Sequence, residues 1–343
     1  MKCPYTNCNE ELKADDVFCT GCGQKVADAP PTNAAVTPPG PPPVRIDTFT
    51  PTVSNYPPFW GTYSAQITRR SPACLIFLVD QSGSMEEPIA GGGGQKKKDM
   101  VTDAINRLLY NTVLRCTKSE ERPWPYFDIG VWTYGGNREV RRAFDSDLIS
   151  ISDVPAKLKR TETRRKREPD GAGGTYEEEI PFAIWIEPAA GGLTPMATAF
   201  RTIAGPVRTW IANNPDSFPP IILNLTDGAY SDENPAPAVW ELMGMKTTDG
   251  QALVFNCHIS QEPGQTLAFP SNDGAAGLTG LARELFEMSS AMPDVMRRLA
   301  GGKGYSLSPG SRGYVFNADI VTMIAFLDVG TQAVQDRMEV VSG

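Results

Sequence analysis

The chain has 343 residues, 41% of them hydrophobic, which is enough to form the core of one large domain or two smaller ones. Its formal net charge of −8 argues against broad binding to nucleic acid or anionic membranes, which needs a basic surface. No apolar run reaches the length of a membrane span and the N-terminus lacks the apolar stretch of a signal peptide, so we expect a soluble, cytoplasmic protein.

The first 26 residues contain two pairs of cysteines, in the stretch CPYTNCNEELKADDVFCTGCGQKV. Thiolates at C-x4-C and C-x2-C spacing can each hold one side of a tetrahedral ion, and four thiolates favour zinc. A module this small has too little core to fold without a metal. A redox pair formed by CTGC is the alternative, which the second pair disfavours. We therefore predict a zinc ribbon over residues 1–26, with structural Zn²⁺ bound by Cys3, Cys8, Cys19 and Cys22.

A linker and lead-in segment is predicted over residues 27–70. Its first part, ADAPPTNAAVTPPGPPP, has a density of proline that excludes helix and sheet interiors and favours extended polyproline geometry. Its second part contains YPPFWGTY, whose aromatic side chains can pack on a neighbouring domain, at a place that the sequence does not indicate.

Strand and helix patterns alternate from about residue 71, which predicts an α/β domain over 71–338 with a doubly wound, mostly parallel sheet. Apolar runs predict strands at 73–80, 126–134, 220–227 and 252–260, with a hairpin partner at 138–144. Helical spacing of apolar residues predicts helices at 97–116 and 196–214, and Pro206 should bend or break the second.

Two charged stretches have no assigned chemistry. The basic run KLKRTETRRKRE, residues 157–168, is predicted to be a solvated loop, with an anionic partner as the alternative. AGGGGQKKKDM, residues 90–100, lacks the end of a phosphate-binding motif and is predicted to be a flexible loop that leads into a helix. His258, the only histidine, is assigned a structural role.

Two apolar strands end on an acid. LIFLVD ends at Asp80 and IILNLTD ends at Asp227, so parallel pairing would bring both carboxylates to one edge of the sheet, where ligands gather. Two adjacent carboxylates repel each other unless a cation lies between them. Carboxylate and hydroxyl oxygens suit Mg²⁺, Mn²⁺ or Ca²⁺ rather than zinc.

The stretch DQSGS, with Asp80, Ser82 and Ser84, resembles the D-x-S-x-S signature of von Willebrand factor A (VWA) domains. GGLTPM supplies the later threonine of that pattern, Thr194, and LTDG supplies the later aspartate, Asp227. The resemblance implies a Rossmann-like fold and a metal-ion-dependent adhesion site (MIDAS) that holds Mg²⁺ or Mn²⁺. The alternative is a helix cap with ordinary turn residues, which would have to explain every member at once.

The resemblance also implies a role for each matched residue. Ser82 and Ser84 would bind the metal through their hydroxyls, and Thr194 would bind it directly in one state and through water in another. Asp80 and Asp227 would hold water molecules that are bound to the metal. Because few of the atoms that bind the ion directly are charged, the ion would stay electropositive. An open position on it would then attract a carboxylate from a partner.

The sequence therefore predicts a metal-dependent protein-interaction module and no enzyme. It is similar to intracellular bacterial VWA proteins of the tellurite-resistance type, which implies signalling or stress response with a protein kinase or a PP2C-type phosphatase as partner. Other members of the wider family serve AAA+ ATPases, and the sequence does not choose between these partners. The alternatives are a Mg²⁺-dependent hydrolase that uses Asp80 and Asp227, and nucleic-acid binding through the ribbon. The ribbon carries few basic residues, which disfavours the last.

Overall fold

The computed structural model describes residues 60–328 except 90–93, 118–121, 137–138, 170–174, 261–264, 320–321 and 324. All of them belong to the second of two units into which the chain divides, residues 55–343. The predicted zinc ribbon with its four cysteines lies outside the described residues, as do residues 27–59 of the predicted linker.

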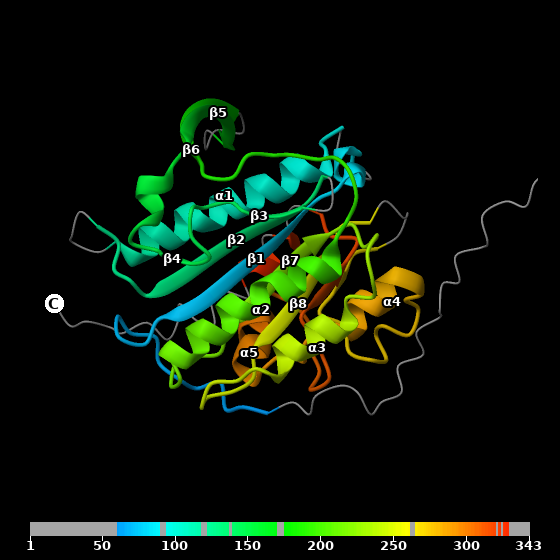
Figure 1. The fold of residues 1–343 in the computed structure, drawn as a ribbon. Helices are drawn as coiled ribbons and strands as arrows, with labels where there is room; N and C mark the ends of the chain where they lie inside the picture. The colour runs from blue at the N-terminus through cyan, green and yellow to red at the C-terminus, as the bar shows by residue number, and fades with distance from the viewer. Residues whose placement is uncertain are drawn as a thin grey trace, which may run out of the picture. The chain divides into compact units, whose positions relative to one another are not determined.

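An eight-stranded sheet forms the centre of this unit, with strand order β3-β2-β1-β7-β8-β10-β9 and with β4 also paired to β2 (Figure 1). Its inner strands are parallel: β1 (Ala73–Gln81), β2 (Phe127–Gly135), β7 (Ile221–Thr226), β8 (Leu253–His258) and β10 (Tyr314–Phe316). Antiparallel strands lie toward its margins: β3 (Glu139–Arg142), β4 (Ile149–Ser150) and β9 (Leu267–Ala268). The predicted mostly parallel α/β sheet is thus confirmed.

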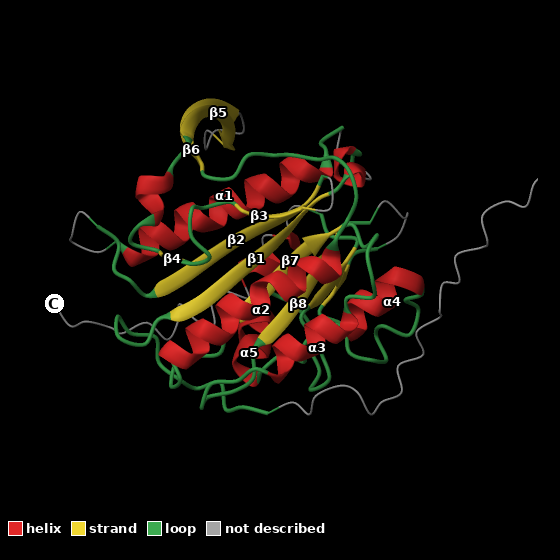
Figure 2. Cartoon of the chain, in the orientation of Figure 1, coloured by secondary structure: helices red, strands yellow, loops and turns green. Residues whose placement is uncertain are grey.

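Helices cover both faces of the sheet (Figure 2). Alternate residues of β1 point to opposite faces. Leu75 and Phe77 belong to one core cluster, whereas Ile76 and Leu78 belong to the other. The first cluster includes residues of α1 (Lys97–Cys116) and α5 (Asp294–Gly302), and the second includes residues of α2 (Met196–Asn213), α3 (Ala236–Gly244) and α4 (Gly280–Glu287). A sheet buried on both sides explains why its strands are almost continuously apolar.

Most of the elements predicted from apolar patterns are confirmed. Helix α1 has the predicted bounds, and β3 is the antiparallel partner predicted for β2. Helix α2 runs from Met196 to Asn213 without interruption at Pro206. Three helices (α3, α4 and α5) and the short 3₁₀ helices η1 (Gly83–Glu86) and η2 (Val154–Lys157) were not predicted.

The prediction of a solvated loop at residues 157–168 is wrong. Most of this stretch forms β5 (Arg160–Pro169), which pairs with β6 (Thr175–Ile184) in a separate two-stranded antiparallel sheet. The register places Arg165 opposite Glu179, with 3.7 Å between their charged atoms. The acidic strand thus offsets the repulsion within the basic one, because opposite charges across a strand pair attract each other.

The aromatic lead-in segment is placed in part. Tyr63 is buried, with its ring 5.9 Å from that of Phe218. The backbone N–H groups of Thr62 and Tyr63 both donate to the carbonyl oxygen of Asp249, at 2.8 and 3.0 Å. The end of the predicted linker therefore packs on the α/β domain, just before β8. No helix in the described part of the chain is long and apolar enough to cross a membrane.

Candidate metal centre

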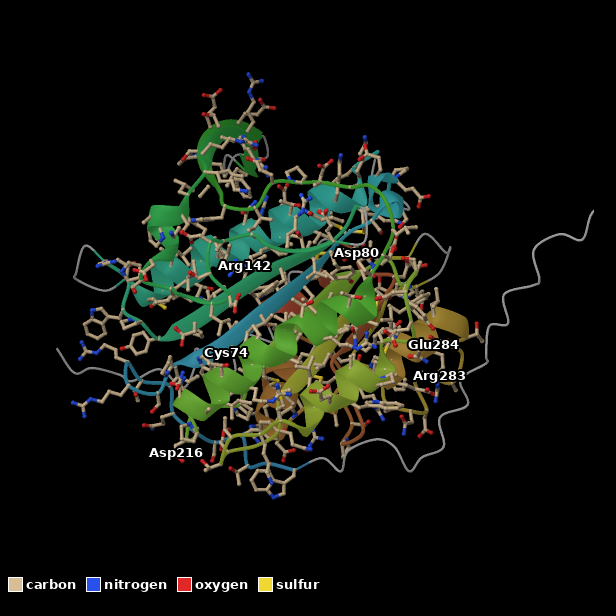
Figure 3. All side chains as sticks on the ribbon, in the orientation of Figure 1. Cys74, Asp80, Arg142, Asp216, Arg283 and Glu284 are labelled. Carbon is tan, nitrogen blue, oxygen red and sulfur yellow. The ribbon has the colours of Figure 1, made fainter. Side chains whose placement is uncertain are left out.

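The candidate site lies at the carboxyl edge of the parallel strands. Strands β1 and β7 pair in parallel, so Asp80 near the end of β1 and Asp227 directly after β7 reach the same edge, as the sequence predicted. Figure 3 labels Asp80 at this end of β1 and Cys74 at the opposite end. The site is therefore built on two of the most deeply buried strands of the sheet.

Asp80 is buried, and both of its carboxylate oxygens accept hydrogen bonds. The backbone N–H of Ser82 donates to Oδ1 at 2.8 Å, and the Thr226 hydroxyl donates to Oδ2 at 2.7 Å. Burial and the nearby Asp227 carboxylate raise the pKa of Asp80 to about 7. Two adjacent carboxylates with neutral hydrogen-bond donors make an environment in which a cation would be strongly stabilised.

Two hydroxyls lie side by side in the turn that follows β1. The Oγ atoms of Ser82 and Ser84 are 3.1 Å apart. Adjacent ligands of an octahedral Mg²⁺, at 2.0–2.1 Å from the ion, lie about 2.9 Å apart. Among the described residues no three His, Cys, Asp or Glu side chains cluster as metal ligands. The oxygen donors at this edge are the two serine hydroxyls and the carboxylates of Asp80 and Asp227. The donor set therefore suits a hard cation rather than zinc.

Asp227 has one oxygen that the protein leaves unsatisfied. Its Oδ1 is buried and has no hydrogen-bond partner among the described residues. Buried carboxylate oxygens are normally hydrogen-bonded, so an unpartnered one needs an explanation, such as a water molecule or ion. A metal-bound water at this oxygen fits the role that the VWA resemblance implies for Asp227. The residues present thus fit the implied metal.

Thr194 reaches the same edge on a loop with close backbone contacts. The N–H of Gly83 donates to the carbonyl oxygen of Gly192 at 3.1 Å, and the N–H of Thr194 donates to Ser231 Oγ at 2.8 Å. Gly192 has φ +66°, and a Cβ there would lie 1.6 Å from the carbonyl oxygen of Gly136. Only glycine allows this approach to Gly136, which follows β2, while the hydrogen bond from Gly83 joins the same loop to the serine turn.

Lys97 is a site residue that sequence analysis missed. Its Nζ lies 3.1 Å from Asp227 Oδ2 and 3.1 Å from Glu87 Oε2, and its side chain is only 4% exposed. Lys97 and Asp227 are 130 residues apart, and the run KKK at the start of α1 does not indicate which lysine turns inward. The ammonium group satisfies the second oxygen of Asp227 and places a positive charge beside the candidate metal position.

His258 lies at this edge as well, in a supporting position. Its Nε2 is 3.0 Å from the carbonyl oxygen of Asp227, and its Nδ1 is 3.2 Å from the Tyr314 hydroxyl. Burial lowers the pKa of His258 to about 4, so the imidazole is neutral near pH 7 and donates from Nε2 to that carbonyl. His258 thereby holds the backbone of Asp227 in place.

Replacing Lys97 with methionine is expected to tighten Mg²⁺ binding by about tenfold or more, because a unit charge a few ångströms from a divalent ion opposes its binding. Methionine keeps most of the buried aliphatic volume. Isothermal titration calorimetry with Mg²⁺ measures the change. The control is Lys98→Met, since Lys98 pairs with Glu86 and not with Asp227. Unchanged or weaker Mg²⁺ binding by Lys97→Met would contradict this role.

Neither the protein-family models nor the curated proteins compared with the chain gave a match. Solved structures that are similar include proximal thread matrix protein 1 of the mussel byssus, with a zinc-occupied MIDAS motif, at 17% identity and TM-score 0.38. They also include the pilus adhesin SpaC of Lactobacillus rhamnosus GG, at 12% identity and TM-score 0.42, and the manganese-loaded TRAP protein of Plasmodium vivax, at 12% identity and TM-score 0.37. The matches cover 78%, 79% and 77% of this chain, and 48%, 31% and 74% of the three structures.

Proposed function

We propose that this chain is a VWA-type interaction module that binds Mg²⁺, or Mn²⁺, at a MIDAS and uses the ion to hold a carboxylate of a partner protein. The observation that carries the proposal is the pair of Ser82 and Ser84 hydroxyls, 3.1 Å apart beside the buried Asp80. Asp227, with its unpartnered buried oxygen, completes the set.

The residues around the metal position explain why a bound ion would in turn bind an anion. Both oxygens of Asp80 already accept hydrogen bonds from the protein, and the serine hydroxyls are neutral. Lys97 offsets part of the charge of Asp227. An ion held in this way keeps much of its positive charge, and a carboxylate is the natural ligand for its remaining position.

The surface beside the serine turn has room for part of a partner. A hollow of about 250 Å³ is lined by the end of β1, the β2–β3 turn and the loop before Thr194, including Gln81, Gly136, Arg141 and Gly191. Leu193, directly before Thr194, is 45% exposed. The partner would place an acidic residue at the metal and an apolar neighbour on Leu193, because interfaces combine apolar anchors with polar groups.

We propose a binding role without catalysis. Hydrolysis at the site would need a general base or nucleophile beyond the metal ligands. His258 is the titratable ring nearest to Asp227, but it is 6% exposed and both of its ring nitrogens have hydrogen-bond partners. Phosphate-ester turnover that depends on Asp80 would contradict this part of the proposal.

We also propose a role for the N-terminal cysteines, a cellular role and a class of partner. The four N-terminal cysteines support a Zn²⁺ ribbon that supplies a second contact on a proline-rich tether. The resemblance of DQSGS and its later partners is to VWA domains in general. The similarity of the chain to the tellurite-resistance type of VWA protein supports a cytoplasmic role in bacterial signalling or stress response. That type favours a protein kinase or a PP2C-type phosphatase as the partner, and the wider VWA family adds an AAA+ ATPase.

A random-peptide display library tests the carboxylate proposal. The library is panned on the full chain in Mg²⁺ and eluted with EDTA. We expect the eluted peptides to share an Asp or Glu whose replacement with Asn or Gln weakens binding at least about tenfold, since the charge on the metal selects the carboxylate. Peptides that lack a shared acid, or that bind equally to Ser82→Ala/Ser84→Ala, would refute it.

A further inference from the structure

A second candidate binding site lies along the middle of α1, where the β5–β6 hairpin packs against the helix (Figure 1). The two elements enclose a cavity of about 450 Å³, here called the hairpin groove. Its lining includes Arg107, Tyr110 and Asn111 of α1 and Arg164, Arg165 and Pro181 of the hairpin. A volume of this size lies in the range of small-molecule and peptide pockets.

The charge of the groove has one sign. All three charged residues that line it are arginines, and no carboxylate lines it. Arg164 is already neutralised, because it forms two hydrogen bonds with Asp103, at 2.7 and 2.9 Å, and also contacts Glu162. Arg164 therefore fastens the hairpin to α1 and is not available to a ligand.

The other two arginines are exposed and are held less tightly than Arg164. Arg107 is exposed and has no carboxylate partner among the described residues, and its guanidinium lies 5.6 Å from the centre of the Phe182 ring. Arg165 is 71% exposed in its side chain and reaches Glu177 and Glu179 only at 3.8 and 3.7 Å. Guanidinium groups bind carboxylates in a bidentate manner, so these two arginines can take acidic side chains.

Apart from the arginines and two asparagines, Asn106 and Asn111, the lining of the groove is apolar or aromatic. Ile180, Pro181 and Ala183 contribute from β6, and the side chain of Tyr110 is 45% exposed at the helix wall. An apolar surface beside two arginines fits a short peptide that carries Asp or Glu next to an apolar residue. A long polyanion fits poorly, because Glu177 and Glu179 lie beside Arg165 and the chain carries a net charge of −8.

We propose that the hairpin groove binds an acidic peptide segment of a partner protein, independently of the metal. Arg107 and Arg165 pair with its carboxylates, and Tyr110 and Pro181 contact its apolar side chain. The groove would act as a second contact in addition to the MIDAS. A partner that engaged both sites would gain affinity because the two contacts are linked.

Panning the same display library in EDTA tests the groove, because chelation removes any metal-dependent binding. We expect enriched peptides with Asp or Glu beside an apolar residue. Fluorescence anisotropy of a labelled enriched peptide should show about tenfold or greater weakening with Arg107→Gln/Arg165→Gln. The control, Arg201→Gln/Arg208→Gln, removes the same charge from exposed arginines of α2 and should bind as the wild type does.

Several outcomes would overturn the groove proposal. One is the absence of enriched peptides in EDTA, and another is enrichment of peptides without acids. Equal weakening by both double variants would indicate general charge attraction rather than a site. Displacement of the peptide by a labelled single-stranded oligonucleotide that binds more tightly would assign the groove to nucleic acid. Because the assay contains EDTA, it measures only metal-independent binding. A negative result would therefore contradict the groove proposal and not the metal-site proposal.

Discussion

Changing Ser82 and Ser84 together to alanine is expected to abolish Mg²⁺ binding while the domain stays folded. The two hydroxyls are the pair placed to bind the ion, and two lost ligands cannot be replaced by water without loss of geometry. The fold should tolerate the change, because Asp80 keeps its hydrogen bonds from the backbone of residue 82 and from Thr226. We expect a stability cost of about 1 kcal/mol.

Isothermal titration calorimetry with Mg²⁺ and with Mn²⁺ measures this effect, and circular dichroism checks the fold. The chain offers a matched control in Ser150→Ala/Ser152→Ala, a second pair of serines at the same spacing, with Oγ atoms 2.8 Å apart and away from the metal edge. This control should bind Mg²⁺ as the wild type does. Equal binding by the Ser82/Ser84 variant would mean that the D-x-S-x-S signature is structural in this chain.

Replacing Asn106 with alanine is expected to lower the free energy of unfolding by about 3 kcal/mol, because three buried backbone groups lose their partner. Asn106 is fully buried in α1. Its Oδ1 accepts from the N–H groups of Trp185 and Ile186, at 2.9 and 3.0 Å, and its Nδ2 donates to the carbonyl oxygen of Ile186 at 2.9 Å. These bonds fix the start of the loop that leads to Thr194, so Mg²⁺ binding should weaken as well.

Urea unfolding followed by near-ultraviolet circular dichroism measures the loss of stability, and the thermal midpoint should fall by roughly 2–4 °C per kcal/mol. The control is Asn111→Ala, an exposed asparagine on the same helix, where alanine should be neutral or slightly stabilising. An Asn106 variant as stable as wild type would show that water satisfies these backbone groups.

The core elements were predictable because their signals are local. Strands β1, β7 and β8 are apolar runs that end near the same edge, and α1 repeats apolar residues at helical spacing. The β5–β6 hairpin was missed because its strands carry charges where a buried strand carries apolar residues. Its stability depends on pairing between strands and on the contact of Arg164 with Asp103 on α1, which no local pattern indicates.

For the candidate site, the amino-acid sequence by itself determined which oxygen-bearing side chains follow two buried strands, since Asp80, Ser82, Ser84 and Asp227 belong to short motifs. Only the tertiary structure decided what surrounds them. It turned Lys97 inward onto Asp227, left Asp227 Oδ1 without a partner and used Thr226 to hold Asp80. Such contacts join residues more than a hundred positions apart, so they arise from the packing of the whole sheet and not from local preference.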